Sequence, residues 1–155
     1  MKRHIPDYYA QDIFSIDPSF FKKQGVRFLL CDLDNTLDSY RLYSPSERVM
    51  AFKEKLEKEG IQLFIISNNH GERVESYANA LGVPFSYSTR KPFTRRLLAF
   101  LKKQGIDKKK CALIGDQLIT DVSCGKKSGI LTILTEPIVK EDQWTTRFNR
   151  LIDRP

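Results

Sequence analysis

The strongest constraint on the fold is a unit that recurs along the chain: a polar helical stretch ends in a glycine, and a short apolar run follows. The glycines that end these stretches are Gly25, Gly60, Gly82, Gly105 and Gly129. A glycine after a helix is the expected left-handed cap. Short, nearly continuous apolar runs are typical of strands that are covered on both faces. The alternation predicts an α/β fold of three layers, with a parallel sheet and helices on both faces.

The stretches between the apolar runs have the spacing of amphipathic helices. Their apolar residues fall three and four positions apart, which places them on one face of a helix. We expect these faces to pack in the core rather than to bind a cofactor. Ser44-Pro45 and Pro92 are the expected helix starts. The three apolar faces are Val49, Phe52 and Leu56; Val74, Tyr77, Ala78 and Leu81; and Phe93, Leu97, Phe100 and Leu101.

The size and composition fit one globular domain over residues 1–155. Hydrophobic residues make up 41% of the 155 residues, and no linker or low-complexity segment divides the chain. No apolar stretch approaches the roughly 20 residues that a membrane-spanning helix needs, and the N-terminal residues lack a signal-peptide pattern. We therefore expect a cytoplasmic protein.

The cysteines do not indicate a disulfide framework or a zinc site. Cys31, Cys111 and Cys124 are dispersed without a CxxC spacing, so we expect small, buried or half-buried thiols. The residues that follow Pro137, which include Trp144, fit either a final helix against the sheet or a mobile arm.

Polar and acidic residues follow the apolar runs where the chemistry of such a fold is expected. Ligands of open parallel sheets bind at the carboxyl ends of the strands, so these residues should converge on one rim. Clustered carboxylates repel one another unless a cation lies among them, and their oxygens suit Mg²⁺. A carboxylate that faces a metal-bound phosphate can attack phosphorus. The residues that follow the runs are Asp32, Asp34 and Thr36; Ser67 and Asn68; Lys91; and Asp116 and Asp121.

Four strings in this order resemble the signatures of the haloacid dehalogenase superfamily of phosphatases. They are DLDNTL, SNN, KP and GDQLITD, and the resemblance spans Phe14 to Pro137. Each string is weak alone, whereas four in order, each after its own apolar run, are a specific signal. The strings are typical of subfamily IIIA, in the YqeG-like group that also resembles phosphatidylglycerophosphate phosphatases. The resemblance implies a Rossmann-like fold and a Mg²⁺-dependent phosphomonoester hydrolase.

The resemblance also implies a role for each acidic residue. Asp32 would be the nucleophile that forms an aspartyl-phosphate, and Asp34 would protonate the leaving alcohol and then activate water. Mg²⁺ would be held by the Asp32 carboxylate, the Asp34 backbone carbonyl and Asp116. Thr36 would orient Asp34.

Further residues would bind the phosphate that is transferred. By the same resemblance, Ser67, Asn68 and Lys91 would contact its oxygens, where charge changes most in the reaction. Asp121 would position Lys91 or a metal-bound water.

The segments between the motifs are too short to hold a cap domain. Asp38 to Gln62 has room for a loop and one helix, and His70 to Thr89 has room for one helix and one strand. An uncapped, open site suits a phosphate on something large, and phosphatidylglycerophosphate is the expected substrate. The net charge of +7 would favour an anionic membrane surface. The aromatic segment Tyr8 to Phe21 fits either an interface contact or a short helix packed on the core.

Two alternatives to a lipid phosphatase stay open. One is a phosphatase of a soluble phosphate ester or of a nucleic-acid end, which the positive charge also suits. The other is a non-catalytic protein of the same fold that binds an anion or RNA. The presence of Asp32, Asp34, Lys91 and Asp116 disfavours this second alternative.

Overall fold

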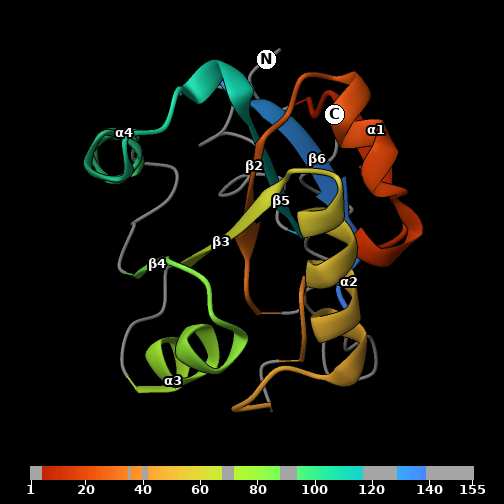
Figure 1. Cartoon of the computed structure of the whole chain (residues 1–155), viewed down its shortest axis with the longest axis vertical. Coiled ribbons are helices and arrows are strands. Elements are labelled where there is room, and N and C mark those ends of the chain that lie inside the picture. The colour runs from red at the N-terminus through yellow and green to blue at the C-terminus, as the bar shows by residue number, and fades with distance from the viewer. Residues whose placement is uncertain are drawn as a thin grey trace.

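The core of the fold is a parallel six-stranded sheet in the order β1-β6-β5-β2-β3-β4 (Figure 1). The computed structural model describes residues 5–34, 36–39, 42–67, 72–87, 94–116 and 129–138. The strands are β1 (Tyr8–Ala10), β2 (Phe28–Asp32), β3 (Gln62–Ser67), β4 (Phe85–Tyr87), β5 (Cys111–Gly115) and β6 (Leu131–Thr135). The predicted parallel α/β sheet is confirmed.

Helices cover both faces of this sheet. They are α1 (Pro18–Lys23), α2 (Glu47–Lys58), α3 (Glu72–Leu81) and α4 (Thr94–Gln104), with short 3-10 turns η2 (Ile13–Ser15) and η3 (Lys108–Lys110). Alternate side chains of each strand point to opposite faces. Leu29 and Cys31 of β2 therefore join one apolar cluster, and Leu30 joins the other.

The two apolar clusters assign each helix to a face. The apolar residues of α1, α2 and α3 belong to the cluster that contains Leu29, whereas Leu97 and Leu101 of α4 belong to the cluster that contains Leu30. In Figure 1, α1 and α2 lie to the right of the strands and α4 to the left. The expected three layers are confirmed. In the residues described between β2 and β3 the one helix is α2, and between β3 and β4 it is α3, as expected for an uncapped chain.

The helix ends follow the sequence signals closely. Each of the predicted glycine caps has a positive φ; Gly82, for example, ends α3 with a φ of +79°. Helix α2 begins slightly later than expected, because Ser46, rather than Ser44-Pro45, is its N-cap and accepts a hydrogen bond from the Val49 amide at 3.3 Å. Pro92, the other expected start, lies outside the described residues.

Strand β1 was not predicted. Tyr8 pairs with Ile133, and Ala10 pairs with Thr135, so β1 extends the sheet beyond β6. The same segment then forms η2 and α1, where the fully buried Phe21 bears out the alternative of a short helix packed on the core.

Two of the cysteines are buried thiols that form no disulfide. These are Cys31 and Cys111, and burial raises the pKa of Cys111 to about 12. Cys124, Trp144 and the residues after 138 lie outside the described ranges. Within those ranges, none of the helices has the length and apolar character needed to span a bilayer.

Candidate active site

The register of three adjacent strands sets three predicted site residues at the same edge of the sheet. Asp32 ends β2 and is level with Ile66 of β3, so Ser67 lies one residue further along. Cys31 is level with Ile114 of β5, so Asp116 also lies just past the level of Asp32. Ser67 and Asp116 are buried, with 1% and 3% of their surface exposed, and Asp32 is half-buried. The sequence prediction that these residues converge agrees with this geometry.

Asp34 lies in the turn after β2 and is held by an arginine that sequence reasoning did not single out. Arg73, in the first turn of α3, forms an ion pair with Asp34 through Nη1 and Oδ1. The same guanidinium donates from Nη2 to the Ser39 carbonyl at 3.0 Å and from Nε to the Leu42 carbonyl at 2.8 Å. The side chains of Arg73 and Asp34 are only 16% and 19% exposed. Arg73 therefore connects α3 to the loop that follows Asp32.

A second contact from α3 reaches the same loop. The Tyr77 hydroxyl donates a hydrogen bond to Asp38 Oδ2, which also accepts from the Ser46 amide at 3.0 Å. Tyr77 is fully buried. Burial, and next the Asp38 carboxylate, raise the pKa of Tyr77 well above its ordinary value, so the hydroxyl keeps its proton and remains a donor. Since Arg73 and Tyr77 are four residues apart, they lie on one side of α3.

The structure does not show the contact expected of Thr36. Its side chain is buried, but Oγ1 makes no hydrogen bond with any residue in the described part of the chain. The side-chain contact seen on Asp34 comes instead from Arg73. The remaining predicted site residues, Asn68, Lys91 and Asp121, lie outside the described residues.

The oxygen donors at this edge fit a hard cation. Asp32 and Asp116 bring two carboxylates from the ends of neighbouring strands, and the resemblance implies the Asp34 backbone carbonyl as a third ligand. Among the described residues there is no group of three or more acidic, histidine or cysteine side chains placed to hold a metal. This is compatible with Mg²⁺, which keeps several waters and usually binds one or two carboxylates together with substrate phosphate oxygens.

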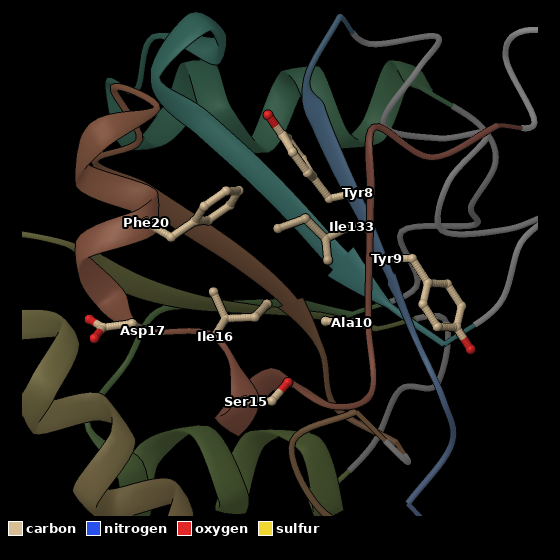
Figure 2. A pocket seen from close by; sticks show the side chains of 8 residues that line it. All are labelled: Tyr8, Tyr9, Ala10, Ser15, Ile16, Asp17, Phe20 and Ile133. Carbon is tan, nitrogen blue, oxygen red and sulfur yellow. The ribbon is translucent and has the colours of Figure 1, made fainter.

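A pocket of about 390 Å³ lies elsewhere, between β1 and the η2–α1 segment (Figure 2). Tyr8, Ile16, Phe20 and Ile133 are among its lining residues, and the rings of Tyr8 and Phe20 meet edge to face with centroids 4.9 Å apart. Figure 2 shows the Tyr9 ring directed away from Phe20, as alternation along a strand requires. Among the predicted site residues that the structure describes, none lines this pocket.

Comparison with known proteins identifies the family. Residues 12–135 match the haloacid dehalogenase-like hydrolase family. The chain belongs to this family. The match covers β2 and β3, which end in Asp32 and Ser67, and β5, which Asp116 follows, so the resemblance predicted from the four strings is confirmed.

Two curated relatives are consistent with this membership. The chain is 37% identical over 153 residues to "Probable phosphatase YqeG" of Bacillus subtilis (strain 168), covering 99% of this chain and 89% of that protein. It is 25% identical over 154 residues to "Phosphatidylglycerophosphate phosphatase 1, chloroplastic/mitochondrial" of Arabidopsis thaliana. That alignment covers 90% of this chain but only 42% of the plant protein.

A solved structure has a similar fold. It is the 3-deoxy-D-manno-octulosonate 8-phosphate phosphatase of Moraxella catarrhalis, in complex with a magnesium ion, a phosphate ion and KDO. The TM-score is 0.58 at 22% identity, over 77% of this chain and 74% of that chain. At this identity the likeness concerns the fold.

Proposed function

We propose that this haloacid dehalogenase-like hydrolase is a Mg²⁺-dependent phosphomonoester hydrolase that works through a phosphorylated Asp32 and acts on phosphatidylglycerophosphate. The family match and the relative at 37% identity support a phosphatase of this family. One observation carries the finer proposal: Asp32, Ser67 and Asp116 end or follow three adjacent strands at one edge.

The proposed reaction has two steps. In the first, a carboxylate oxygen of Asp32 attacks phosphorus, the bond from phosphorus to the leaving alcohol breaks, and Asp34 gives its proton to that alcohol. In the second, Asp34 takes a proton from a water that attacks the same phosphorus, which releases inorganic phosphate and restores Asp32. The Ser67 hydroxyl, at the end of β3, would donate a hydrogen bond to a non-bridging phosphate oxygen. Lys91 and Asn68 would add to this contact.

The donor set described above would hold Mg²⁺ through the Asp32 and Asp116 carboxylates and the Asp34 carbonyl. When bound, the ion would offset negative charge that these carboxylates and the phosphate bring together. Asp116 is almost fully buried, and a buried carboxylate is costly without compensating charge or hydrogen bonds.

Four observations support a lipid as the substrate. The described residues leave the site uncapped, which suits a phosphate that projects from a large assembly. Leu42 and Tyr43 are 39% and 67% exposed, and Arg73 ties the Leu42 carbonyl and Asp34 together. Apolar side chains beside the site suit a substrate with an apolar body. The net charge of +7 would favour an anionic bilayer, and one relative carries a phosphatidylglycerophosphate phosphatase name.

Phosphate release from defined substrates tests the proposal. Purified protein with Mg²⁺ is given vesicles that contain phosphatidylglycerophosphate, a soluble alkyl phosphate, a 5′-phosphorylated oligonucleotide and 4-nitrophenyl phosphate, with Asp32→Asn as the control. We expect the vesicle substrate to have the highest kcat/KM and Asp32→Asn to release no phosphate. Faster turnover of the alkyl phosphate or the oligonucleotide would overturn the lipid assignment. Activity in Asp32→Asn would overturn the mechanism.

A further inference from the structure

We propose that Arg73 is a positioning residue for Asp34: it fixes the carboxyl group that protonates the leaving alcohol, and so makes the enzyme competent for alkyl phosphates. This inference rests on the proposed function, because it assigns Asp34 the role of proton donor. It adds a residue that lies outside the four motifs.

Three acceptors of the protein bind the guanidinium of Arg73. Nη1, Nη2 and Nε of Arg73 each bind a different acceptor, which are Asp34 Oδ1, the Ser39 carbonyl and the Leu42 carbonyl. A guanidinium is planar and its donors diverge in fixed directions, so three acceptors determine both its position and its orientation. The group that holds Asp34 is therefore itself fixed.

Helix α3, which carries Arg73, is itself packed in the core. Val74, Tyr77, Ala78 and Leu81 of this helix are buried in the core, so Arg73 projects from a packed element. Tyr77 binds Asp38 on the same loop, and Asp38 in turn accepts from the Ser46 amide at the start of α2. In Figure 1, α3 and the segment that leads into α2 lie at the same lower end of the molecule. The loop that carries Asp34 is thus attached to α3 at two places.

The geometry favours a positioning role over direct binding of substrate. Three nitrogens of Arg73 already bind acceptors of the protein, and the Asp34 carboxylate offsets its charge. The ion pair engages Oδ1 of Asp34, the residue to which the reaction above assigns the proton transfer. Arg73 therefore acts through Asp34.

A positioning role makes a specific kinetic prediction. An alkyl alcohol leaves poorly unless it is protonated, whereas 4-nitrophenol leaves readily as an anion. Since kcat/KM reports the steps up to departure of the leaving group, Arg73→Ala should lower it far more for an alkyl phosphate. We expect a loss of about 100-fold for the alkyl phosphate, at the low end of what general acid catalysis contributes, and of less than about 5-fold for 4-nitrophenyl phosphate.

Matched variants separate this role from a merely structural one. Arg73→Lys keeps the charge without the fork of donors, so it should restore part of the alkyl-phosphate activity. Arg27→Ala removes an exposed arginine at the opposite end of β2 and should leave both substrates unaffected. In an Asp34→Asn background, Arg73→Ala should lower kcat/KM for the alkyl phosphate only slightly further, because Arg73 then has no acidic group to position.

Hydrogen exchange gives a readout that does not depend on activity. Arg73→Ala should speed exchange of the backbone amides of residues 36–39, 42–44 and 46, and Arg27→Ala should not. Equal kinetic losses on both substrates, full additivity with Asp34→Asn, or unchanged exchange would each overturn the positioning role. If the wild-type protein hydrolyses none of the phosphate esters, the proposed function fails, and the exchange measurement still decides whether Arg73 holds the loop.

Discussion

Replacing Tyr77 by phenylalanine removes one buried hydrogen bond and leaves the ring in place. The hydroxyl donates to Asp38, whose surface is only 4% exposed. Hydrogen bonds to charged groups contribute about 1.5–3 kcal/mol, because the acceptor left behind is poorly solvated. We therefore expect Tyr77→Phe to lower the free energy of unfolding by about 2 kcal/mol, a large share of the roughly 5–15 kcal/mol typical of a domain.

Urea denaturation at neutral pH measures this change. The midpoint should fall while the m-value stays constant, since the surface exposed on unfolding is nearly unchanged. Tyr43→Phe is the matched control, because Tyr43 is 67% exposed and its substitution should change stability by less than about 0.5 kcal/mol. A loss in Tyr77→Phe no larger than in Tyr43→Phe would refute the reasoning.

The same variant has a signature at alkaline pH. The pKa of Tyr77 is raised in the folded state, so above pH about 10 the folded protein keeps a proton that the unfolded chain releases. The contribution of Tyr77 to the free energy of unfolding is fully present below pH about 10. Above that pH it decreases by about 1.4 kcal/mol per pH unit. Tyr77→Phe has no such pH dependence from this position. The difference in free energy of unfolding between the wild-type protein and Tyr77→Phe should therefore narrow above pH about 10. A constant gap would contradict the prediction.

Other substitutions test the fold and the substrate. Gly82→Ala should lower the free energy of unfolding by about 1–2 kcal/mol, because a φ of +79° strains a residue with a Cβ. The nearest atom to the new Cβ is the flexible Lys53 Nζ at 3.4 Å, so crowding should add little. Unchanged stability in thermal unfolding would contradict this. Phe64→Ala should lower the free energy of unfolding, measured in urea, by about 3–5 kcal/mol, since the ring is buried between the sheet and α4. A decrease below about 1 kcal/mol would show that this face is poorly packed. Leu42→Ser with Tyr43→Ser should lower phosphate release from lipid vesicles several-fold and leave 4-nitrophenyl phosphate turnover unchanged, because both side chains are exposed and the Leu42 backbone shares Arg73 with Asp34. Equal effects on both substrates would remove the support for a lipid.

The sheet and its helices were predictable because their signals are local. Each of β2, β3 and β5 is a continuous apolar run, and each helix has one apolar face, so the elements can be recognised without knowing their neighbours. Strand β1 has no such signal. It has three residues, two of them exposed, and it exists because its backbone pairs with β6.

One part of the candidate site could be predicted from local signals in the sequence, and another part could not. Asp32, Ser67 and Asp116 follow strands, and parallel register alone brings them together. The contact of Arg73 with Asp34 joins residues 39 positions apart and depends on how α3 lies over the loop, which no local pattern specifies. Tyr77 was correctly placed in the core by its spacing, but its hydroxyl also binds Asp38, and the apolar pattern does not carry that information. The roles assigned to Asp32, Asp34, Ser67 and Asp116 stay predictions, as do those of Asn68, Lys91 and Asp121, which lie outside the described residues.

Trapping the phosphorylated enzyme tests the central claim most directly. The protein is mixed with Mg²⁺ and radiolabelled substrate, quenched in acid, reduced with borohydride to mark any acyl phosphate, and mapped by peptide mass spectrometry. We predict a single mark at Asp32, at the end of β2, and none in Asp32→Asn. A mark on another residue, or phosphate release with no trapped acyl phosphate, would contradict Asp32 as the nucleophile.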